Sequence, residues 1–129
     1  MRAAVVLVLL SILFWPLVGC KQDQERPPTT HKVEGKVVYR DGKAFTTGGA
    51  IEFRHETVDG AASRGTIKPD GTFDLYTMTA QNKLPGAQEG SHIVTIFPTT
   101  TDKTAQPISV KKKYVIVAGD NSVTVQLND

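Results

Sequence analysis

After residue 31, apolar and polar residues alternate one by one, and this alternation limits what the chain can fold into. The odd positions there begin with Val33, Gly35, Val37 and Tyr39, and most of the residues between them are charged. Successive side chains of a strand point to opposite faces, so the pattern predicts a strand with one face toward a core. No stretch of useful length has the 3.6-residue apolar period of an amphipathic helix. We therefore expect an all-β domain.

Similar strand signals recur along the chain, separated by turn sequences. Asp41-Gly42 and Pro69-Asp70-Gly71 are typical turns, because Asp bonds to nearby backbone and Gly accepts a positive φ. We expect loops at 78–90 and 98–107, where the alternation breaks. Seven short strands predict a sandwich or a barrel. They are 33–39, 51–54, 64–68, 73–76, 91–97, 114–117 and 123–127, the last two forming a hairpin around Gly119-Asp120-Asn121.

Two of these strands carry more specific expectations. In the fourth, Phe73 and Leu75 are expected to point inward and Tyr76 outward. The fifth strand, 91–97, is apolar at both even and odd positions, which is typical of a central strand.

The first 20 residues have the pattern of an export signal. Arg2 precedes an apolar run from Ala3 to Val18, which is short for a permanent membrane span. The run ends in Leu17-Val18-Gly19-Cys20, which resembles the lipobox of bacterial lipoproteins. The resemblance implies removal of residues 1–19 and attachment of lipid to Cys20. A plain secretory signal and a buried core helix are the alternatives.

Residues 20–31 are expected to be the lipidated cysteine and a flexible tether. The tether is polar, contains Pro27-Pro28, and holds the domain at most about 35 Å from the membrane. We expect a cell-envelope location, on the periplasmic or outer face. Lys21, where enterobacterial lipoproteins retained at the inner membrane have Asp, favours the outer membrane.

The order of motifs in the remaining segment, 32–129, resembles the bacterial carboxypeptidase-regulatory-like domain. The resemblance implies a seven-stranded Greek-key β-sandwich of transthyretin or prealbumin type. Gly42-Lys43-Ala44-Phe45 departs from the family, which has Pro where Ala44 stands. The matching motifs are Val33-Glu34-Gly35-Lys36-Val37, Gly49-Ala50-Ile51-Glu52-Phe53, Pro69-Asp70-Gly71-Thr72-Phe73, Leu84-Pro85-Gly86 and Ser91-His92-Ile93-Val94-Thr95-Ile96.

Composition and motifs give no sign of catalysis, and we expect a protein that is not an enzyme. A formal net charge of +2 gives no electrostatic footprint for nucleic acid. The single cysteine is assigned to lipid. His31 is expected to be solvated, His55 to end a strand and His92 to lie in the core, so we expect no metal and no cofactor. The chain end also lacks the Tyr-Arg-Gly-Ser of transthyretin-like hydrolases.

The candidate contact residues are few. Phe45 is expected to be exposed, either as a contact or as cover for a sheet edge, and the second is favoured. Tyr76 is the other exposed aromatic, and Lys111, Lys112 and Lys113 are expected on a solvated strand edge. The favoured hypothesis is a lipid-anchored module that binds an envelope protein through its loops or sheet edges. A carbohydrate-binding module is the alternative, and the oligomeric state stays open.

Overall fold

The computed structural model describes residues 19, 26–58, 62–101 and 103–127, and its regular elements are all strands. The all-β prediction is therefore confirmed. No helix in the described part of the chain is long and apolar enough to cross a membrane. In chain order the strands are β1 (Thr30–His31), β2 (Val33–Val38), β3 (Gly49–His55), β4 (Ala62–Ile67), β5 (Thr72–Asp74), β6 (Tyr76–Met78), β7 (Lys83–Pro85), β8 (Ala87–Gln88), β9 (Gly90–Pro98), β10 (Ile108–Ile116) and β11 (Asn121–Gln126).

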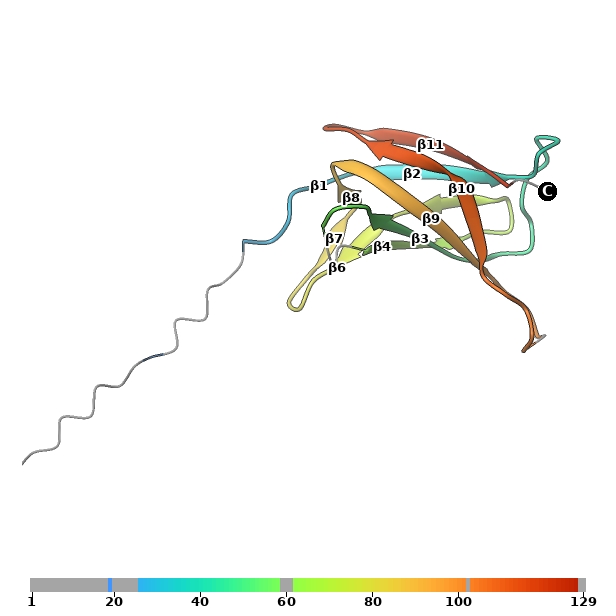
Figure 1. Ribbon diagram of the computed structural model, residues 1–129, viewed down its shortest axis with the longest axis horizontal. Coiled ribbons are helices and arrows are strands. Elements are labelled where there is room, and N and C mark those ends of the chain that lie inside the picture. The colour runs from blue at the N-terminus through green and yellow to red at the C-terminus, as the bar shows by residue number, and fades with distance from the viewer. Residues whose placement is uncertain (1–18, 20–25, 59–61, 102, 128–129) are drawn as a thin grey trace, which may run out of the picture.

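Two sheets form a sandwich (Figure 1). One has six strands in the order β10-β9-β3-β4-β6-β7, and the other has three in the order β11-β2-β5. A small β1-β8 pair lies where the chain enters. The predicted count of seven strands is wrong. The predicted fourth strand divides at Leu75, where the chain passes from the three-stranded to the six-stranded sheet, and the predicted loop 78–90 contains β7 and β8.

The core lies between the sheets and confirms the alternation. Phe73 and Leu75 are buried, as predicted, and the Phe53 ring lies 6.0 Å from that of Phe73. The strand β9 is central, as predicted, but only one of its faces is covered. Ile93 and Phe97 on the other face are 41% and 40% exposed. An apolar run thus identified the central strand without revealing its open face.

Gly35 lets the three-stranded sheet close tightly on the core. A Cβ atom at this position would lie 2.6 Å from Cζ of Phe73 and 2.3 Å from the carbonyl oxygen of Val123. Both distances are shorter than any ordinary contact, so only glycine fits here. The Phe73 ring occupies the space where a side chain on residue 35 would lie.

The predicted C-terminal hairpin is wrong. The strand β10 pairs with β9, whereas β11 crosses to the other sheet and runs parallel to β2. Asn121 holds the crossing turn: its Nδ2 donates to the carbonyls of Val117 (2.9 Å) and Gly119 (3.0 Å), and its Oδ1 accepts from the Val117 N–H (2.9 Å). Turn residues and alternation look the same whether the next strand pairs with its neighbour or with another sheet.

The strand β1 lies within residues 20–31, the expected tether. Thr30 pairs with Gln88 and His31 with Ala87, so the last two residues of the predicted tether belong to the sandwich. His31 is half-buried rather than solvated, and its Nδ1 accepts a hydrogen bond from the Gly119 N–H. Between Pro98 and Ile108 the described residues form no strand, as predicted.

Candidate binding surfaces

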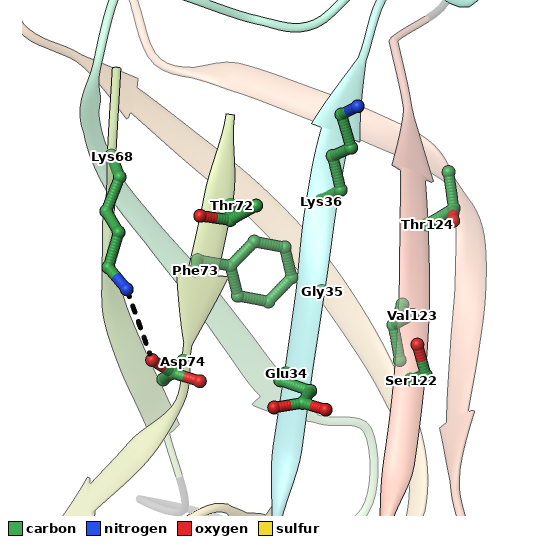
Figure 2. A pocket seen from close by; sticks show the side chains of 10 residues that line it. All are labelled: Glu34, Gly35, Lys36, Lys68, Thr72, Phe73, Asp74, Ser122, Val123 and Thr124. Carbon is green, nitrogen blue, oxygen red and sulfur yellow. Dashed lines mark ion pairs between the residues drawn. The ribbon is translucent and has the colours of Figure 1, made fainter. Parts of the chain in front are cut away.

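A groove of about 410 Å³ lies on the outer face of the three-stranded sheet (Figure 2). Its walls carry charges of both signs and several hydroxyl groups. Figure 2 shows the ring of Phe73 pointing toward Gly35 on the neighbouring strand. The lining residues are Glu34, Gly35, Lys36, Lys68, Thr72, Phe73, Asp74, Ser122, Val123 and Thr124.

Strand register places these side chains in two rows across the sheet. Residues directly opposite each other in neighbouring strands share a face. Asp74, Glu34 and Ser122 form one row, and the other contains Thr72, Lys36 and Thr124. Lys68 reaches the first row from the end of β4, with its Nζ 3.7 Å from Oδ2 of Asp74. The groove therefore offers both hydrogen-bond donors and acceptors.

The outer edge of β11 adds backbone groups to this groove. The Asn121 N–H donates to the Lys32 carbonyl and the Leu127 N–H to the Val38 carbonyl, so odd-numbered residues of β11 face β2. By alternation the N–H and C=O groups of Ser122 and Thr124 point away from β2. At the end of the strand, the Gln126 N–H donates to the Tyr114 hydroxyl, 3.2 Å away.

The outer face of the six-stranded sheet is a second surface, and Glu52 lies at its centre. One row crosses all six strands: Ser109, Thr95, Glu52, Arg64, Tyr76 and Pro85. Glu52 is only 4% exposed although it lies on the outer face. Its Oε1 lies 2.9 Å from Nη2 of Arg54, and its Oε2 lies 2.9 Å from Nη2 of Arg64. Each arginine covers one carboxylate oxygen while remaining largely exposed itself.

The prediction that Phe45 is exposed is wrong, because its side chain is 3% exposed and belongs to the core. Its N–H donates to the Val37 carbonyl, and its ring lies 5.6 Å from that of Tyr39. The turn after β2 brings the residue back over the end of that strand, so the side chain fills the end of the core. Phe45 is thus unavailable as a contact residue.

Tyr76 points outward, as predicted, but its ring is partly covered. It is half-buried, and the Nζ of Lys83 on the neighbouring strand lies 4.1 Å from the ring centroid. A cation at that distance occupies the ring face on which a sugar would stack.

Lys111, Lys112 and Lys113 lie on an edge strand and are exposed, as predicted. Val110 pairs with Val94 and Tyr114 with His92, so the three lysines oppose Ile93 alone in a bulge. Lysines and bulges both discourage strand addition at an edge. Lys113 also forms an ion pair with Glu56, and this contact lowers the pKa of the Glu56 carboxyl.

His55 and His92 meet at the end of the core, with ring centroids 5.0 Å apart. The Nδ1 of His55 accepts from the N–H groups of Thr57 and Val58, so its Nε2–H donates to the Glu89 carbonyl. His92 is buried, and desolvation lowers the pKa of its imidazole. The described residues contain no cluster of three or more side chains able to hold a metal ion.

Sequence reasoning missed the groove and the face around Glu52. In the sequence, both surfaces are represented only by the polar residues of the alternation: Glu34 and Lys36 for the groove, and Glu52 and Arg54 for the other face. Alternation assigns these residues to solvent, and only register shows which of them are neighbours. Of the predicted lipobox, the structure describes Gly19, which is exposed. Leu17, Val18 and Cys20 lie outside the described residues.

No family model and no curated protein matches this sequence. Among solved structures, a DUF3823 family protein from Parabacteroides merdae is similar, with 15% sequence identity and a TM-score of 0.47. The match covers 78% of this chain and 47% of that one, so the chain spans about half the length of this neighbour.

Proposed function

We propose that the chain is an exported lipoprotein whose carboxypeptidase-regulatory-like sandwich binds an extended segment of an envelope protein without catalysing a reaction. The proposed export and lipid attachment rest on the lipobox-like sequence Leu17-Val18-Gly19-Cys20, with the lipid on Cys20. Lys21 favours a location in the outer membrane. Two or more acyl chains are enough for stable anchoring. The tether then joins the domain at β1, at one end of the sandwich (Figure 1).

The groove beside the outer edge of β11 carries the binding proposal. The backbone groups of Ser122 and Thr124 that point away from β2 are able to pair with an added strand. Glu34 and Lys36 in the groove would contact its alternate side chains. Edge pairing supplies affinity that is independent of sequence, and the charged walls supply selectivity. This combination favours an extended polar peptide over a compact small molecule.

The alternative, a carbohydrate-binding module, would need exposed aromatic rings, and neither of the two expected rings is open for stacking. Phe45 is buried and Lys83 covers Tyr76. Sugar rings stack on open aromatic faces, so the protein-binding proposal has the stronger support.

Cross-linking in intact cells tests the proposal directly. A photoreactive residue at Ser122 should give a discrete protein adduct, identified by mass spectrometry. The matched variant adds Thr124→Pro, which removes an outward-facing N–H without touching the β2 ladder. The adduct should then fall by at least about tenfold while the domain stays folded. Adducts to glycan alone, or a protein adduct unaffected by Thr124→Pro, would overturn the proposal.

A further inference from the structure

The outer face of the six-stranded sheet has an asymmetric charge distribution, and we call it the cationic face. Its exposed cations are Arg54, Arg64 and Lys83, together with Lys111 and Lys113 in the bulge of β10 opposite Ile93. Two carboxylates lie among these five cations: Glu52, which is buried and held by Arg54 and Arg64, and Glu56 after the end of β3, which pairs with Lys113. The face therefore keeps an excess of positive charge. The opposite face, around the groove, has charges of both signs.

Exposed apolar side chains lie among these cations. Ile93 and Phe97 on β9 are 41% and 40% exposed, and Val115 on β10 and Met78 on β6 are 64% and 62% exposed. Register places them on the same face, since Ile93 lies opposite Arg54 and Met78 opposite Lys83. Cationic and apolar side chains on one surface are typical of elements that lie in the headgroup region of a membrane.

The tether keeps a membrane within reach of this face. Thr30 is ten residues after Cys20, a distance of at most about 35 Å when extended. Six strands at a spacing of roughly 4.8 Å make the face about 24 Å wide, comparable to this reach. A tethered surface acts at high effective concentration, so weak contacts are enough for docking.

We propose that the cationic face docks on an anionic phospholipid surface, an inference that rests on the proposed lipid anchor. The guanidinium groups of Arg54 and Arg64 would bind lipid phosphates, and Glu52 fixes their position. Ile93 and Val115 would enter the headgroup layer. Docking in this orientation turns the groove away from the membrane, toward a partner. A second copy would bring cations against cations, which disfavours self-association through this face.

Acylated protein, extracted from membranes and reconstituted into vesicles, tests this docking. An environment-sensitive fluorophore is attached at Val115→Cys or, as the opposite-face control, at Ser122→Cys. Lipid blocks Cys20, so only the introduced thiol reacts. With phosphatidylglycerol in phosphatidylcholine vesicles, we expect a blue shift of emission at position 115 and none at position 122.

Two matched charge reversals complete the experiment. Lys83→Glu with Lys111→Glu should abolish the shift, whereas Lys36→Glu with Lys68→Glu, the same charge change on the groove face, should preserve it. Acylated protein that stays on vesicles without a shift overturns the docking but not the anchor. A shift that is equal without anionic lipid, or cross-links from position 115 to an acidic protein instead of lipid, also overturns it. Protein purified without an acyl chain overturns both proposals.

Discussion

At the scale of single residues, Glu52 shows how a charge is accommodated on an otherwise open sheet. The carboxylate is desolvated by the two arginines that cover it, and both of its oxygens accept charge-assisted hydrogen bonds. Arg54 and Arg64 are 69% and 63% exposed, so solvent screens much of the attraction. The cluster therefore orients the arginines more than it stabilises the fold.

We expect Glu52→Gln to destabilise the domain by only about 1 kcal/mol, the value for a screened, charge-assisted pair. Urea unfolding of both proteins would measure the difference. Glu34→Gln is the control, since Glu34 is exposed and forms one surface pair with Lys32. A loss of several kcal/mol for Glu52→Gln, or equal losses in both variants, would contradict this description.

His92 should make stability depend on pH. Burial, and to a smaller extent the nearby His55, lower the pKa of the His92 imidazole below its ordinary 6.5, although the Gly90 carbonyl acts in the opposite direction. Below about pH 6.5 His92 binds a proton in the unfolded chain but not in the folded protein. The contribution of neutral His92 to stability is therefore complete above about pH 6.5, and it is lost as pH falls toward the pKa of the folded state. The pKa values of the Glu56 and Asp70 carboxyls are lowered from 4.5 and 3.8, so their contributions to stability are lost at lower pH than that of His92.

Urea unfolding between about pH 7.5 and 5 would measure this dependence. The variant His92→Gln should flatten the decline over that interval. An identical pH dependence in the variant would mean that His92 is not its source.

At the scale of elements, the passage from β10 to β11 is one of the crossings that join the two sheets. Asn121 satisfies the backbone groups of the turn that the strands leave unpaired. The crossing also places the outer edge of β11 beside the groove. A hairpin at this point would have added β11 to the six-stranded sheet and removed that edge.

Asn121→Ala should therefore cost about 2–3 kcal/mol, since a buried side chain loses four hydrogen bonds, one of them a long 3.3 Å bond to the Lys32 carbonyl. Chemical denaturation would measure the loss. Ser122→Ala, one residue further and exposed, should change stability by less than about 0.5 kcal/mol. Similar stability of the Asn121 and Ser122 variants would contradict the assigned role of the turn.

Much of this arrangement was predictable from local sequence, and the rest depends on long-range pairing. Alternation predicted the buried Phe73, because inward residues follow from strand geometry. The continuous apolar run 91–97 predicted that β9 lies inside its sheet. Sheet membership of β11 and burial of Phe45 depend on contacts between distant segments, which no local pattern encodes. The groove is formed by β2, β5 and β11, which are far apart in the sequence. Its lining residues could be identified only once the pairing register of these strands was known.

At the scale of the whole molecule, the two faces of the sandwich differ in chemistry while the tether joins at one end (Figure 1). The cationic face carries arginine, lysine and apolar side chains, and the groove face carries charges of both signs. In the proposed lipoprotein, this division assigns one face to the membrane and leaves the other for a partner. All of these assignments depend on the modification of Cys20.

The mass of the protein extracted from membranes of a lipoprotein-processing bacterium tests that modification most directly. We predict a chain that begins at Cys20, lacks residues 1–19 and carries a diacylglyceryl group on the Cys20 sulfur. A Cys20→Ser variant should lose the added mass and leave the detergent phase. A mature protein with an unmodified Cys20, or a Cys20→Ser variant that stays in the detergent phase, would contradict the account.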